Sequence, residues 1–157
     1  AARQDIERLG ALHAALVTVK QAYWAGQVDI QRQAVAAWVA RAEGKIDEAL
    51  RLMRAAADAE DATEKHIVSP GLIVPARELL GEMLLEASRP AEALKEFETS
   101  QAKEPNRFRG YYGAARAAEL QGDREKARAN YAKLVALTEK ADGDRPEIRE
   151  AKAALAR

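Results

Sequence analysis

The chain has 157 residues, with 25 Lys and Arg against 25 Asp and Glu, so that its net charge is zero. A balanced charge argues against a nucleic-acid or anionic-membrane partner, because both attract a basic excess. The absence of cysteine excludes disulfides and thiolate metal sites, and the longest apolar run, residues 34–40, is too short to cross a bilayer.

Strong helix formers dominate the composition, and no alternating β-branched run is present. We therefore predict an all-α protein without membrane insertion. The chain begins at Ala1 rather than methionine and carries no signal peptide, which suggests a processed or truncated product. The sequence predicts a soluble protein of the cytoplasm or the periplasm and does not decide between them.

The first predicted element is a helix from about residue 5 to residue 24. Apolar residues recur there at steps of three and four, as on one face of a helix. Gly26 is expected to end it, because glycine adopts the left-handed cap conformation without steric cost. Helices over about 30–43 and 47–61 follow, and the short turn at Gly44 predicts that they lie antiparallel.

The rest of the chain continues in helical pairs after an interruption. Ser69-Pro70-Gly71 marks a turn inside an inserted loop. The predicted organisation is a single domain with these parts: N-terminal helix 1–27, hairpins 28–61, 75–105 and 106–140, inserted loop 62–74, and C-terminal capping helix 144–157.

The second and third predicted hairpins share a repeated sequence pattern. Ala93 and Ala127 lie 34 residues apart, and so do Phe97 and Tyr131. Self-similarity at a fixed period is typical of repeat proteins. The first hairpin matches this pattern only in part, with Ala49 in the position of the repeated alanine.

The chain resembles the tetratricopeptide-repeat (TPR) family, whose unit is 34 residues and two helices. Leu80-Gly81, Ala93, Phe97 and Pro105 fall on the family's leucine-glycine pair, alanine, aromatic and closing proline. The third unit has Ala114-Ala115 for the pair, which departs from the pattern. The resemblance implies a right-handed α-solenoid of antiparallel helix pairs, about seven or eight helices in all. It also implies a non-enzymatic scaffold that binds a protein or a peptide on its concave face.

Placing the family's concave face on this sequence gives seven candidate partner-binding residues. They are Trp38, Arg41, Glu78, Glu82, Arg109, Tyr112 and Arg116. Two structural alternatives stay open. Glu82 and Arg116 occupy equivalent places on neighbouring hairpins and could simply pair, and Trp38 could belong to the core.

One subclass of the family binds acidic C-terminal tails through lysine, asparagine and arginine on this face. The corresponding places here hold Glu78, Glu82, Tyr112 and Arg116, so we predict that the chain has no carboxylate clamp of that type.

The sequence contains only weak signals for a metal site and none of the catalytic motifs considered below. Glu60 to His66 contains three acids and a histidine, but a single imidazole without another nitrogen or sulfur ligand is a weak metal signal. There is no phosphate loop, nucleophile elbow or cysteine–histidine pair. We predict no enzyme activity, no metal and no cofactor. The alternative function is that of a C-terminal helical stack in a longer protein, serving domain docking or self-association as a homodimer.

Overall fold

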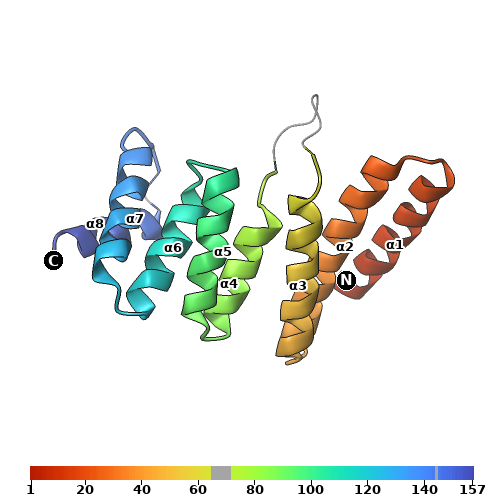
Figure 1. The fold of residues 1–157 in the computed structure, drawn as a ribbon, viewed down its shortest axis with the longest axis horizontal. Coiled ribbons are helices and arrows are strands. Elements are labelled where there is room, and N and C mark those ends of the chain that lie inside the picture. The colour runs from red at the N-terminus through yellow and green to blue at the C-terminus, as the bar shows by residue number, and fades with distance from the viewer. Residues whose placement is uncertain (65–71, 144) are drawn as a thin grey trace. The chain divides into compact units, whose positions relative to one another are not determined.

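A computed structural model describes residues 1–64, 72–143 and 145–157 of the chain. Within these ranges the secondary structure is entirely helical (Figure 1). The helices are α1 (Ala2–Thr18), α2 (Ala22–Ala42), α3 (Ile46–Asp61), α4 (Ala76–Glu86), α5 (Pro90–Lys103), α6 (Phe108–Leu120), α7 (Arg124–Leu137) and α8 (Pro146–Leu155). The predicted all-α class is confirmed. His66 and residue 144, where the predicted last helix begins, lie outside the described residues.

The chain divides into two compact units, Ala1–Leu80 and Gly81–Arg157. The division falls inside α4, so the first unit holds α1 to α3 and the start of α4. The second unit holds the remainder of α4 and α5 to α8. The single domain stays a prediction, and each unit is described by itself below.

The first turn of the chain lies at Val19–Gln21, and the predicted end of the first helix at Gly26 is wrong. Lys20 adopts φ 58°, and the amide of Gln21 donates to the carbonyl of Leu16 at 2.9 Å. These bonds form a Schellman cap, in which one left-handed residue satisfies the last carbonyls of a helix. A lysine therefore occupies the place where the sequence suggested glycine, and Gly26 lies inside α2.

The same cap closes the first helix of each hairpin. Gly44, Ser88 and Gly122 all have positive φ, and the amide after each donates to the carbonyl five residues earlier. Ser88 and Gly122 lie 34 residues apart, in phase with the sequence repeat. The hairpin turns thus repeat in backbone conformation even where the residue type changes.

In the first unit, α1, α2 and α3 pack side by side as successive antiparallel helices (Figure 1). Small side chains dominate the contact, because Ala37, Ala49, Ala56 and Ala57 are fully buried. Alanine at a helix crossing lets the two axes approach closely. No residue of α1 is buried, so this helix covers α2 without a core of its own.

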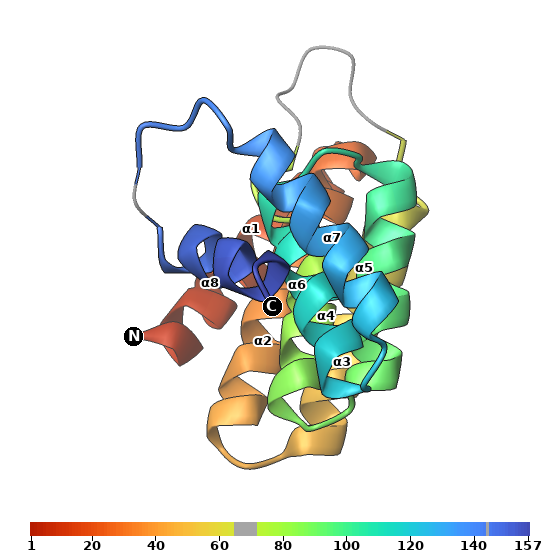
Figure 2. The same ribbon diagram turned by 90° about the vertical axis from the view of Figure 1, so that its left-hand side faces the viewer.

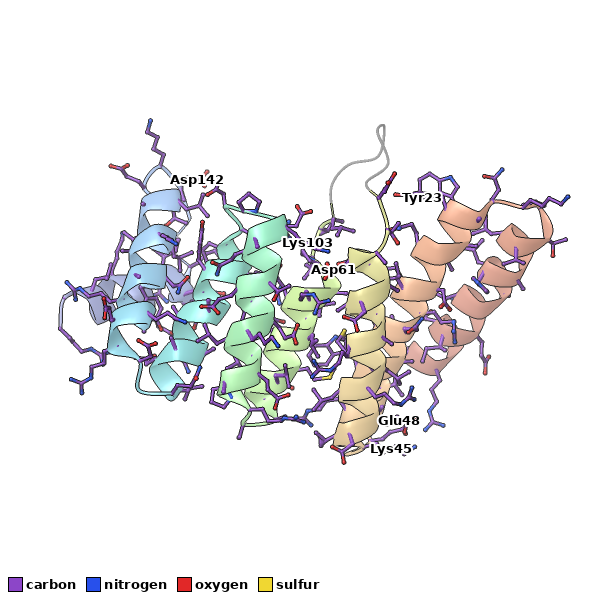
Figure 3. The ribbon with its side chains drawn as sticks, viewed as in Figure 1. Tyr23, Lys45, Glu48, Asp61, Lys103 and Asp142 are labelled. Carbon is purple, nitrogen blue, oxygen red and sulfur yellow. The ribbon has the colours of Figure 1, made fainter. Side chains whose placement is uncertain are left out.

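The acids at the end of α3 bridge the inserted loop. Figure 3 labels Asp61 at the end of α3 opposite Lys45 and Glu48. Glu60 accepts a hydrogen bond from the amide of Ala76 at 2.7 Å, and Arg77 pairs with Asp61 at 2.6 Å. Glu60 therefore satisfies an N-terminal amide of α4 that has no partner within its own helix. These contacts give part of the acidic segment a structural role.

In the second unit, the ring of Phe97 on α5 is wedged against two glycines. A Cβ atom added to Gly113 on α6 would lie 2.2 Å from Phe97 Cζ, and one added to Gly81 on α4 would lie 2.7 Å from it. Phe97 is fully buried, so the ring has little room to move. The two glycines thus let an aromatic ring touch the helix backbone on both sides.

At the end of the unit, α8 crosses α7 and buries Ile148 and Ala151 (Figure 2).

Gly113→Ala should lower the free energy of unfolding by about 1–3 kcal/mol, because the new methyl group overlaps the Phe97 ring. Urea denaturation measures this change. Gly26→Ala is the matched control, since a Cβ there meets nothing within 4 Å inside a helix. It should stabilise the protein by roughly 0.5–1 kcal/mol. Equal stability of the two variants would contradict a close contact between the Phe97 ring and Gly113.

Glu60→Ala should destabilise the protein by about 0.5–2 kcal/mol, because it leaves the Ala76 amide without its acceptor. Glu7→Ala, at an exposed position of α1, serves as the control and should change stability by less than about 0.5 kcal/mol. Thermal unfolding of both variants at neutral pH makes the comparison.

Candidate functional site

A groove of about 360 Å³ lies within the second unit. Its walls come from the end of α4, from α6 and from the segment that leads into α8. Four of the predicted partner-binding residues line it, namely Glu82, Arg109, Tyr112 and Arg116. The remaining lining residues are Leu85, Glu86, Phe108, Gly113, Arg145 and Glu147.

The pattern of α6 explains why this helix presents a polar face. Arg109, Tyr112 and Arg116 recur at steps of three and four, which places them on one side of the helix. The residues between them include the fully buried Ala114 and Ala115. Because alanine fills the inner face, α6 packs closely, and Arg109, Tyr112 and Arg116 line the groove.

Both arginines of α6 that line the groove form ion pairs, one with Glu82 of the groove and one with Glu150 beside it. Arg109 Nε donates to Glu82 Oε1 at 2.9 Å, and Arg116 Nη1 lies 3.4 Å from Glu150 Oε2. The Tyr112 hydroxyl donates to the same Glu150 oxygen at 2.5 Å. The arginine side chains keep 46% and 41% of their surface exposed, so these pairs are weak and can be exchanged for a partner's groups.

The predicted pair between Glu82 and Arg116 is replaced by two others. Glu82 pairs with Arg109, and Arg116 pairs with Glu150, which lies 34 residues further along the chain. Arg116 therefore pairs with the residue one repeat period after it instead of the residue one period before it. Helix α8, which packs on α7, supplies this partner.

The apolar part of the groove is formed by Leu85, Phe108 and the ring of Tyr112. The guanidinium carbon of Arg145 lies 4.4 Å from the centroid of the Phe108 ring, within cation–π range. Beside them, Glu147 Oε2 is buried and has no hydrogen-bond partner among the described residues. The groove therefore offers an aromatic surface next to an acceptor with unused capacity.

The three remaining predicted residues do not line this groove. Trp38 and Arg41 lie on α2 in the first unit, where Trp38 is half-buried. Glu78 is fully buried, so its proposed place on an exposed binding face is wrong. The start of α4 turns Glu78 inward, whereas Glu82, one turn later, reaches the groove.

Sequence reasoning missed Phe108, Arg145, Glu147 and Glu150. Three of them belong to α8 or to the residue before it, which the sequence suggested to be only a polar cap. The 34-residue distance from Arg116 to Glu150 was the available signal. Following the repeat beyond residue 140 would have placed Glu150 beside Arg116.

No group of three or more His, Asp or Glu side chains suited to a metal ion occurs in the described part of the chain. Across residues 1–64, 72–143 and 145–157, no helix combines the length and apolarity needed to cross a membrane.

The environment of Tyr112 changes its ionisation. Burial raises its pKa to about 12, with further contributions from the hydrogen bond and the charge of Glu150. A raised pKa means that folding favours the neutral hydroxyl, which donates to Glu150. The stability that this bond contributes is complete below pH 10 and is lost as the pH rises through about 12.

Tyr112→Phe should lower the free energy of unfolding by about 0.5–1.5 kcal/mol at neutral pH, since it removes this hydrogen bond and keeps the ring. An absorbance titration of the folded protein should lose a tyrosinate step near pH 12. Tyr111→Phe, on the neighbouring residue, should retain that step. Loss of a step near the ordinary tyrosine pKa of 10 instead would show that Tyr112 does not bind Glu150.

The amino-acid sequence matches no family model. It also has no significant match among curated proteins.

The fold of this chain resembles those of solved structures. PcrH from Pseudomonas aeruginosa aligns at a TM-score of 0.63 with 16% identity, over 81% of this chain and 89% of that one. A crystal structure of nearly identical TPR-like repeats assigned to a Podosopora anserina kinesin light chain aligns at a TM-score of 0.66 with 20% identity. That alignment spans 99% of this chain and 76% of the other. The chain therefore has a TPR-like fold of antiparallel helix pairs.

Proposed function

We propose that this chain is a non-enzymatic scaffold that binds a short peptide segment of a partner protein in the groove of Glu82, Arg109, Tyr112 and Arg116. The observation that carries the proposal is the composition of this groove. It combines aromatic surface, exchangeable ion pairs and a buried carboxylate oxygen without a hydrogen bond among the described residues. Binding sites in proteins typically join apolar walls to a few polar groups that fix orientation.

The groove favours a peptide with an apolar or aromatic anchor. Such a side chain would pack on Leu85, Phe108 and Tyr112, where burial of apolar surface supplies the affinity. A donor next to the anchor, from a lysine, an arginine or the peptide backbone, would satisfy Glu147 Oε2.

A purely acidic tail suits the groove less well. Arg109 and Arg116 already face Glu82 and Glu150, so an incoming carboxylate has to displace a carboxylate of the chain. The proposed peptide is therefore apolar with a basic or neutral flank, and the absence of a carboxylate clamp remains a prediction.

Selection from a random library of short linear peptides tests the proposal. The protein should enrich sequences with an aromatic or aliphatic anchor, and fluorescence anisotropy then measures the Kd of a selected peptide. Tyr112→Ala should weaken binding about tenfold or more, because it removes part of the apolar wall. Tyr111→Ala is the matched control, as this neighbouring tyrosine does not line the groove.

A second control separates the groove from the docking of α8. Glu150→Ala breaks the same hydrogen bond as Tyr112→Ala but removes no residue that lines the groove. It should leave the Kd within about threefold, a change of less than about 1 kcal/mol. Equal losses in Tyr112→Ala and Tyr111→Ala would overturn the proposal. Failure to enrich any peptide, together with a concentration-dependent dimer in light scattering, would replace it with self-association.

A further inference from the structure

The second unit contains another groove, of about 640 Å³, that the proposed function does not use. Its walls come from the end of α6, the first two turns of α7 and the end of α8. It shares no lining residue with the groove of Tyr112. A ligand of this second groove would therefore contact different residues from the peptide proposed above.

Three arginines line this groove, Arg124, Arg128 and Arg157. All three are exposed to solvent at its walls. Arg128 Nη1 donates to the carbonyl of Leu155 at 2.9 Å, which anchors its guanidinium beside the last turn of α8. The groove thus has a fixed cation at one wall and two further arginines around it.

These arginines differ from most others in the chain. Arg89, Arg109 and Arg116 each pair with a carboxylate. Across the described residues, Arg124, Arg128 and Arg157 have no carboxylate at ion-pair distance. In a chain with no net charge, three uncompensated arginines on one groove form a local excess of positive charge.

The acid inside this groove is already bound. Glu119 lines it, and Glu119 Oε2 accepts a hydrogen bond from the hydroxyl of the buried Tyr131 at 3.2 Å. This bond holds the carboxylate against the floor of the groove and not against the arginines. With one acidic side chain and three arginines, the side chains that line the groove carry a net positive charge.

We propose that this groove binds an acidic, extended segment of a protein through Arg124, Arg128 and Arg157. Guanidinium groups bind carboxylates with two parallel hydrogen bonds, which gives affinity and orientation together. A volume of about 640 Å³ is within the range of sites that enclose ligands of many atoms and is far larger than one small anion needs. Several consecutive carboxylates fit this size and charge better than a free ion does.

Anisotropy titration with fluorescein-labelled hexaglutamate at low ionic strength tests this assignment. The double variant Arg124→Gln, Arg157→Gln should weaken binding about tenfold or more, because it removes two charge-assisted contacts. Neither side chain forms a hydrogen bond or an ion pair with another described residue, so the variant should fold normally, which circular dichroism checks. The matched control Arg51→Gln, Lys95→Gln removes the same charge from exposed positions of α3 and α5 and should bind within about twofold.

Three results would overturn the assignment. They are an absence of hexaglutamate binding to the unmodified chain, equal weakening in the control variant, and inorganic phosphate that binds as tightly as the peptide. The last would show that the groove recognises a single oxyanion and not an extended segment. The assignment also predicts that a phosphoserine peptide without other acids binds more weakly than hexaglutamate. Such a peptide offers only one charged group to the three arginines.

Discussion

The contact of Phe97 with the backbones of α4 and α6 is the constraint on which the second unit depends. The ring fits only because Gly81 and Gly113 lack a Cβ atom. It fixes how closely α5 approaches the helices on either side, and this spacing sets the position of the polar face of α6. Gly113 also lines the groove of Tyr112, so one residue serves the packing of the core on one side and the shape of the candidate site on the other.

Helix α8 completes both grooves. Arg145 and Glu147, at its start, line the first, while Ala154 and Arg157, at its end, line the second. Its Glu150 meets Arg116 at the distance of one repeat, and Ile148 and Ala151 bury its inner face. Helix α8 therefore contributes residues to both grooves in addition to covering α7. The two proposed sites therefore depend on the docking of α8, through different residues.

The two grooves divide the charges of a neutral chain in different ways. In the first, arginines and carboxylates are mutually paired, so the free energy of binding has to come largely from the apolar surface of Leu85, Phe108 and Tyr112. In the second, the arginines have no carboxylate partner among the described residues, and the charge itself is available to a ligand. This difference gives the grooves opposite preferences, one for an apolar anchor and one for an acidic segment.

The sequence by itself determined the helical class, most of the helix bounds and the repeat, because apolar periodicity, turn residues and the 34-residue spacing are local or regular signals. It also placed Arg109, Tyr112 and Arg116 on one helix face through their spacing, whereas Glu82 was added to them by the resemblance to the TPR family. Only the tertiary structure decided that Lys20 ends α1, that Glu78 is buried, and that Glu150 is the partner of Arg116. These outcomes depend on which helices pack together and on which left-handed residue closes a turn, and neither is encoded by the residue types of a single segment.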